Sequence, residues 1–198
     1  MNSSLITSIL PVITLVLGLV LREALDWIKF RRKHGIIRKA LMDEIEDIKF
    51  WAEDARETIE KMVSDISQDK VPNGLLIKIA HPVFTEHFPQ VYVQLASSER
   101  IHFNAIYRLV GSINSQYERL AEVRLKYELA PPQHKEEMLS VLQDTYTSAR
   151  LVSYRAAFYS DGGKELNLHK SNTQKLISQY EAEFANLYQH AANSTPRI

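Results

Sequence analysis

Residues 41–66 read LMDEIEDIKFWAEDARETIEKMVSDI, and this stretch decides the fold of the chain. Apolar side chains recur in it at alternating spacings of four and three residues, which places them in one stripe along an α-helix. The stripe consists of Leu41, Ile45, Ile48, Ala52, Ala55, Ile59, Met62 and Ile66. Such a heptad seam predicts a long helix that either packs inside a bundle or pairs with a second subunit.

Three later segments repeat this pattern, and each ends at a turn signal. The second stripe contains Phe103, Ile106, Val110, Ile113, Tyr117, Leu120 and Tyr127, and Arg124 interrupts it. The third contains Met138, Leu142, Ala149, Val152, Ala156 and Tyr159, and the fourth contains Ile177, Tyr180, Phe184 and Leu187. Pro131-Pro132 and Asp161-Gly162-Gly163 separate these helices. We therefore predict an all-α fold, a bundle of about four helices with heptad-like seams.

The segment between the first two helices is the least regular. Val71-Pro72-Asn73-Gly74 is a turn signal, and Pro82 and Pro89 bracket the residues that follow. Neither proline suits a helix interior, so we expect a short helix or an ordered loop between them. Ser97 or Ser98 is the predicted N-cap of the next helix.

The first 21 residues carry no charge, and a basic stretch follows them. A helix over these residues is roughly 30 Å long, about the thickness of the hydrocarbon core of a membrane. A cleaved signal peptide would need a basic start and a small-residue cleavage site, and a buried core helix would show a polar stripe. The chain has no basic start, no such cleavage site and no polar stripe in this segment, so we predict a single transmembrane helix. The anchor residues are Leu5, Ile9, Pro11, Ile13, Leu17 and Leu21.

The charge pattern gives the predicted orientation. Residues 22–39 contain seven basic and two acidic side chains, whereas residues 43–60 contain eight acidic and two basic ones. Basic residues stay on the cytoplasmic side, so we expect the N-terminus outside and the bundle in the cytoplasm. If the protein is bacterial, the membrane is the inner, cytoplasmic one. The residues that set this topology or contact lipid headgroups are Arg22, Lys29, Arg31, Arg32 and Lys33. We favour the topological role, because the positive-inside rule already explains these residues.

The predicted organisation has five parts. They are a transmembrane anchor (1–22), a juxtamembrane helix that continues into the bundle (23–66), an irregular connector (67–97), the remaining bundle helices (98–192) and a tail (193–198). Gly35 is the only glycine between residues 19 and 73, so it is the predicted position of any bend in the first helix.

No motif in the chain predicts a catalytic, metal or cofactor site. There is no phosphate-binding glycine loop and no H-E-x-x-H, and the chain has no cysteine. His81, Glu86 and His87 come close together in sequence, but a polar loop explains them better than a metal site. The 24 basic residues balance the 24 acidic ones, so nucleic acid is not an expected partner.

The layout resembles the HEPN ribonucleases, small helical bundles of this size. Some HEPN-like bundles carry an N-terminal membrane helix and serve as accessories in bacterial antiviral systems. The HEPN hallmark is an arginine followed, after four to six residues, by a histidine, and no arginine from Arg22 to Arg155 has a histidine at that distance. The resemblance therefore rests on organisation alone, and a ribonuclease would need a pair assembled across helices.

Two classes of function follow. The favoured prediction is a non-enzymatic, membrane-tethered interaction or oligomerisation module, such as an accessory or membrane effector in antiviral defence. Its expected partners are the membrane and, in addition, further copies of the chain, a cytoplasmic protein, or both. The alternative is a tethered HEPN-like ribonuclease with an unconventional site. An interaction module should expose an apolar patch on the bundle, whereas an enzyme should have convergent polar residues in a cleft.

Overall fold

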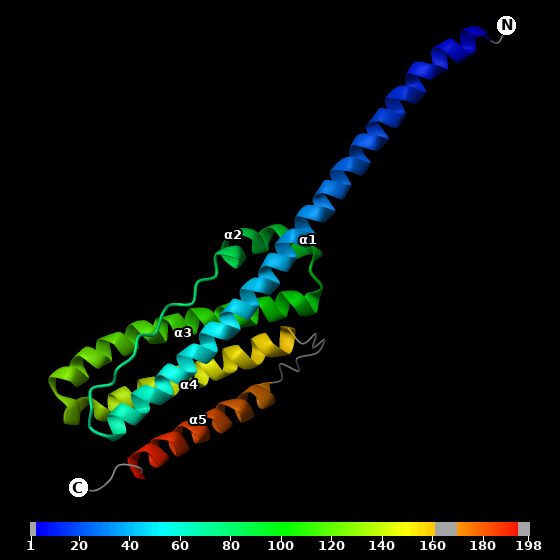
Figure 1. Ribbon diagram of the computed structural model, residues 1–198. Helices are drawn as coiled ribbons and strands as arrows, with labels where there is room; N and C mark the ends of the chain where they lie inside the picture. Colours follow the sequence, from blue (N-terminus) through cyan, green and yellow to red (C-terminus); the bar gives the residue numbers. More distant parts are fainter. Residues whose placement is uncertain (1–2, 161–169, 194–198) are drawn as a thin grey trace.

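A computed structural model describes residues 3–160 and 170–193, with side chains described for 15–159 and 172–193. Over these residues the chain is helical and contains no β-strand, which confirms the all-α prediction. The elements are α1 (Ser3–Ser67), α2 (Pro82–Val91), a 3₁₀ turn η1 (Tyr92–Gln94), α3 (Ser97–Leu129), α4 (Pro131–Ser160) and α5 (Lys170–Asn193) (Figure 1).

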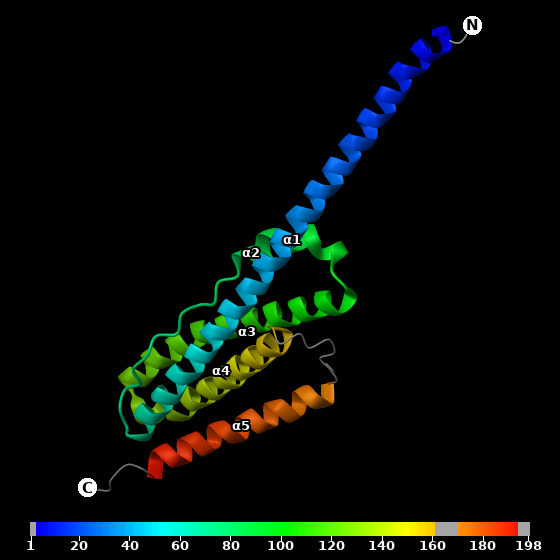
Figure 2. The ribbon, with the colours of Figure 1, turned by 45° about the vertical axis from the view of Figure 1, so that its right-hand side comes forward.

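Helix α1 has two parts with different surroundings. Its N-terminal part extends away from the bundle as a rod, and its C-terminal part packs against the other helices (Figures 1 and 2). Among the side chains that the structure describes, from residue 15 onward, the first buried one is Ile37. The helix is unbroken at Gly35, where a Cβ would meet nothing within 4 Å. The predicted position of a bend is therefore ordinary helix in this structure.

Helix α4 lies at the centre of the bundle, in contact with α1, α3 and α5. Only Ala130 separates α3 from α4, so the two form an antiparallel hairpin, and Pro131 and Pro132 fall in the first turn of α4. Proline is tolerated there because the first backbone N–H groups of a helix have no partner within it. Helix α2 packs on α1, and α5 contacts both α1 and α4.

The apolar stripe of residues 41–66 faces the interior of this single chain. All eight of its side chains are buried. They belong to two core clusters, one around Ile48, Phe103 and Val152 and the other around Ile59, Leu120 and Leu142. Because the seam is occupied within the chain, any contact between subunits must use another surface.

Two local predictions in the connector region were wrong. Pro89 lies inside α2, which continues to Val91. The missing N–H of Pro89 leaves the carbonyl of Thr85 without its helical partner, and Thr85 is exposed to water. Helix α3 begins at Ser97 itself with Ala96 as its N-cap, and the Glu99 carboxylate accepts the Ala96 N–H at 2.9 Å. Glu99 thus supplies the half of a capping box that binds the N-cap N–H, whereas Ala96 has no side-chain acceptor for the first free N–H groups of α3.

The rest of the connector, residues 68–81, lies along α3 without regular secondary structure. The side-chain amide of Asn114 accepts the Ile79 N–H at 2.9 Å and donates to the Ile79 carbonyl at 3.0 Å. Arg124 donates to the Gly74 carbonyl at 2.8 Å, which explains why a charge interrupts the apolar stripe of this helix. The connector has no regular secondary structure to pair its backbone groups, and side chains of α3 form some of these hydrogen bonds instead.

Candidate partner-binding surface

An apolar groove lies between the connector and α3, toward the end of the bundle that is remote from the N-terminus. It encloses about 390 Å³. Its walls come from Met62, Gly74, Leu75, Leu76, Tyr117, Leu120, Ala121, Arg124, Leu125 and Glu128. A volume of this size is in the range of ligand and side-chain pockets.

Gly74 makes the groove possible by letting the connector approach α1. A Cβ on this residue would lie 2.8 Å from Met62 Cε and 2.8 Å from Thr58 Cγ2, which is closer than carbon atoms approach each other. The connector therefore passes over α1 at Gly74 and then follows α3. The groove is the space that remains between the connector and α3.

The rim of the groove exposes large apolar side chains. Leu75 is 78% exposed and Leu125 is 64% exposed, and both line the groove. Leu129 follows Leu125 by one helical turn and is 88% exposed. Ile77, two residues beyond Leu75 in the connector, is also exposed. Exposed apolar side chains that gather at a groove are typical of interaction sites.

The charges at the groove are already paired. Arg124 Nε lies 3.0 Å from Glu128 Oε1, and its Nη1 binds the Gly74 carbonyl. Tyr117 is buried, and its Oη has no hydrogen-bond partner among the described residues. Burial, with a smaller contribution from Asp54, raises the pKa of Tyr117 above its ordinary value, so the phenol stays neutral. The groove therefore favours an apolar occupant over a charged one.

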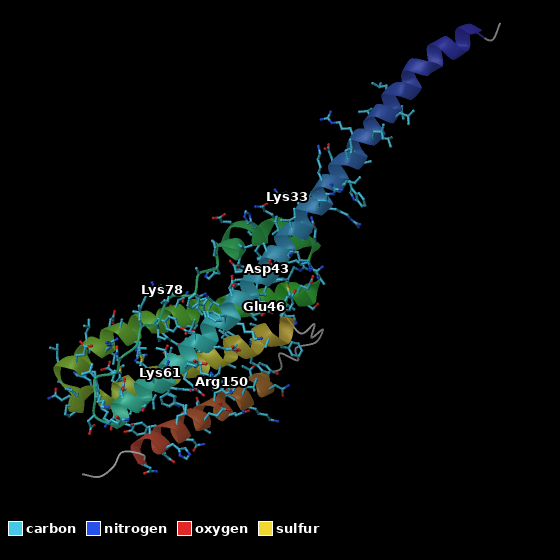
Figure 3. All side chains as sticks on the ribbon, in the orientation of Figure 1. Lys33, Asp43, Glu46, Lys61, Lys78 and Arg150 are labelled. Atoms are coloured by element: carbon cyan, nitrogen blue, oxygen red, sulfur yellow. The ribbon has the colours of Figure 1, made fainter. Side chains whose placement is uncertain are left out.

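The residues predicted for the anchor lie on the N-terminal part of α1. Leu17 and Leu21 are exposed, whereas the side chains of Leu5, Ile9, Pro11 and Ile13 lie outside the described residues. Among residues 15–159 and 172–193, whose side chains the structure describes, no helical segment is long and apolar enough to cross a membrane. The basic residues are exposed on the same rod, and Lys33 lies near the point where α1 leaves the bundle (Figure 3).

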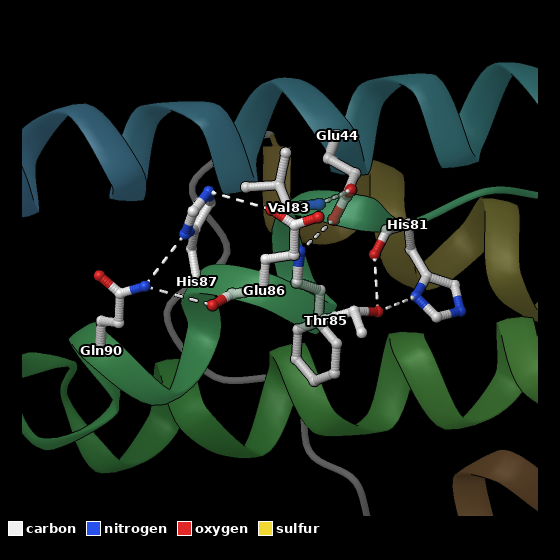
Figure 4. A network of polar contacts seen from close by, with 8 residues as sticks. Glu44, His81, Val83, Thr85, Glu86, His87 and Gln90 are labelled. Carbon is white, nitrogen blue, oxygen red and sulfur yellow. Dashed lines mark hydrogen bonds and ion pairs between the residues drawn. The ribbon is translucent and has the colours of Figure 1, made fainter.

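The histidines of the connector region do not converge on a common point. His81 and His87 lie on opposite sides of α2 (Figure 4). His81 Nδ1 contacts Thr85 Oγ1 at 3.1 Å, and His87 contacts Gln90 at 3.1 Å and Glu86 at 3.7 Å. Among the residues that the structure describes, no group of three potential ligands is placed to hold a metal ion.

Glu44 is a buried carboxylate that sequence reasoning missed. It accepts the N–H groups of Val83 at 2.7 Å and Phe84 at 3.0 Å (Figure 4). It also accepts the hydroxyl of Tyr107 at 2.6 Å. A residue of α1 thus caps the N-terminus of α2, where a negative charge is favourable. The signal was its position three residues after Leu41 and four before Ile48, which places it beside the apolar stripe.

Glu44→Gln should lower the free energy of unfolding by about 1–3 kcal/mol, because the new amide NH₂ faces groups that are themselves donors. Urea unfolding followed by circular dichroism measures this loss. Glu46→Gln, the same substitution at an exposed position of α1 (Figure 3), is the matched control and should stay within about 0.5 kcal/mol of wild type. Equal stability of the two variants would contradict the capping role.

An arginine and a histidine do come together across two helices. Arg155 of α4 is close enough to His102 of α3 for its charge to lower the histidine pKa, although burial is the larger cause. His102 is 7% exposed and lies beside the rings of Phe158 and Tyr159. Arg155 Nη2 also reaches Thr173 Oγ1 of α5 at 3.3 Å. The imidazole is therefore neutral and largely shielded from solvent.

Comparisons with protein-family models, with curated proteins and with solved structures found no match to this chain. The functional argument therefore rests on the residues and their geometry.

Proposed function

We propose that the protein is a membrane-tethered helical module that associates with further copies of itself through the groove. One observation carries this proposal: α1 is a single helix from Ser3 to Ser67. The same helix thus contains the uncharged N-terminal segment, the basic stretch and the first core stripe. Between Leu15 and Leu21 its large apolar side chains are exposed and have no packing partner in the bundle.

The geometry of α1 supports a division of roles along the rod. At about 1.5 Å per residue, the part before Lys33 extends roughly 45 Å. Between Ile37, where burial begins, and Met62, at the groove, lie roughly another 38 Å. With the N-terminal segment in the membrane and the basic residues at the cytoplasmic headgroups, the groove faces away from the lipid. A protein surface is then a better occupant than a lipid chain.

A second copy of the chain is the occupant that this surface favours. The surface contains both an apolar hollow and a projecting leucine, Leu129, one turn from the hollow. Two copies related by a two-fold axis can each place this leucine in the groove of the other, which makes the contact self-complementary. Tethering in one membrane also raises the effective concentration of the copies.

Leu129→Lys should weaken self-association of the full-length protein at least tenfold. The reason is that a charge replaces a leucine whose burial in the groove of the second copy contributes about 1.5–3 kcal/mol. The measurement is the mass by light scattering in mild detergent, with the detergent contribution subtracted. Val93→Lys is the matched control, since Val93 is exposed in η1 and does not line the groove.

The wild-type protein and the Val93→Lys variant should be dimers or larger, and Leu129→Lys should be monomeric. A monomeric wild-type protein, or equal loss of mass in both variants, would contradict self-association at the groove. A cytoplasmic partner protein would then be the next occupant to test.

A tethered ribonuclease is the second candidate function, and the nearness of His102 to Arg155 favours it. A neutral imidazole serves as a general base, and a guanidinium stabilises the negative charge of a phosphate. RNA would have to reach a histidine that is largely buried, so we rank this candidate second. The role in antiviral defence stays a prediction for both candidates.

A further inference from the structure

A second cavity lies where α1 leaves the bundle. Its lining is mainly polar, whereas the lining of the groove is mainly apolar. It encloses about 380 Å³. It is lined by Arg31, His34, Gly35, Arg38, Val91, Gln94, Leu95 and Glu99. Arg31, His34 and Arg38 are spaced by three and four residues, so a single face of α1 presents all three to the cavity.

Both arginines of the cavity are held by neighbouring side chains. The Arg31 guanidinium lies over the ring of Trp27, 4.4 Å from its centroid. Arg38 forms an ion pair with Glu99 through Nη2, and Glu99 is itself fixed by the Ala96 N–H. A guanidinium carries five N–H donors, so Arg38 retains donors beyond those that Glu99 engages. Two pre-positioned cations against one carboxylate leave the cavity with a positive charge.

His34 connects this face of α1 to the turn after α2. Its Nδ1 lies 2.6 Å from the Phe30 carbonyl, which can only accept, so Nδ1 carries a proton. Its Nε2 lies 3.1 Å from Gln94 Nε2 and 3.2 Å from the Gln90 carbonyl. With its proton on Nδ1, the ring accepts from the Gln94 amide through Nε2. Both ring nitrogens are therefore engaged, and His34 fixes this face of α1 against the turn after α2.

We infer that this cavity binds a phosphate group through Arg31 and Arg38. Guanidinium groups bind phosphate oxygens with paired, charge-assisted hydrogen bonds, and the cavity holds two of them on one wall. The phosphate belongs either to a lipid headgroup or to a free phosphorylated molecule. Binding of a lipid headgroup rests on the proposed membrane tether, because that tether puts the cavity at the headgroups. Binding of a free phosphorylated molecule does not depend on the tether.

Arg31→Gln and Arg32→Gln form a matched pair for the test. The two residues are adjacent and exposed, and each substitution removes one positive charge, but only Arg31 lines the cavity. Neither residue has an ion pair among the described residues, so both variants should fold and melt like wild type by circular dichroism.

The experiment is calorimetric titration of the full-length protein in dodecyl maltoside at about 0.15 M salt, where long-range effects of charge are screened. One arm uses inorganic phosphate, a second uses dioctanoyl phosphatidic acid, and a third uses dioctanoylglycerol, which has no phosphate, as the control lipid. We expect saturable binding that Arg31→Gln weakens about tenfold and Arg32→Gln changes less than twofold.

Saturation by inorganic phosphate identifies a site for a free phosphate, and saturation by phosphatidic acid alone identifies a headgroup site. The inference is overturned if neither probe saturates, or if the two variants lose affinity equally. Because the protein is held in detergent, a negative result here leaves the membrane tether to be judged by its own experiment.

Discussion

Ile48→Asp is expected to abolish cooperative folding of the bundle. Ile48 is fully buried in the cluster that joins α1, α2, α3 and α4. Loss of a core isoleucine costs about 2–5 kcal/mol, and burial of an unpaired carboxylate adds several more. Domains are stable by only about 5–15 kcal/mol, so this single change should consume most of that margin.

Phe50→Asp is the control for this prediction. It introduces the same charge two residues later on the same helix, at a side chain that is 62% exposed. Urea unfolding followed by far-ultraviolet circular dichroism should show a normal transition for Phe50→Asp and no cooperative transition for Ile48→Asp. A stable, helical Ile48→Asp protein would show that the stripe of residues 41–66 is not the core of the bundle.

Deletion of residues 2–21 is expected to release the protein from membranes. The deleted segment is uncharged, and transfer of so many apolar side chains from lipid to water costs far more than a peripheral contact supplies. The measurement is flotation with phosphatidylcholine vesicles in a density gradient at high salt. The full chain should float with the vesicles, and the deleted chain should stay at the bottom.

The high salt and neutral lipid remove a second source of binding. Residues 22–39 have a net charge of +5 and are expected to adhere to anionic lipid even without the anchor. Since burial begins at Ile37, the deletion should leave the bundle and its melting temperature unchanged. Flotation of the deleted chain under these conditions would assign the anchoring to another part of the molecule.

Periodicity was sufficient to predict the helices and much of their interior. The stripe on α1 and the stripe on α3 from Phe103 to Tyr127 are buried, apart from the interruption at Arg124. Spacings of three and four residues mark one face of a helix whatever lies opposite. The pattern could not tell whether that face meets the same chain or another, and the structure places it inside the chain.

The groove and the polar cavity at Arg31 and Arg38 depend on contacts between segments distant in sequence. Gly74 sets the approach of the connector to α1, and Asn114 holds the connector on α3, but neither residue belongs to a periodic pattern. Arg124 was the one available signal, because a charge at a seam position needs a partner. Glu44 carried a similar signal beside its own seam.

Single-cysteine labelling tests the central claim, a membrane tether with the bundle in the cytoplasm, most directly. The chain has no cysteine, so Asn2→Cys and Lys70→Cys each introduce a unique thiol, one before the uncharged segment and one in the connector. Each full-length variant is expressed in bacterial cells made permeable at the outer membrane and treated with a maleimide that cannot cross the inner membrane. We expect labelling of the Asn2→Cys variant in intact spheroplasts and of the Lys70→Cys variant only after lysis. Protection of both thiols until lysis would contradict a membrane-spanning N-terminal helix.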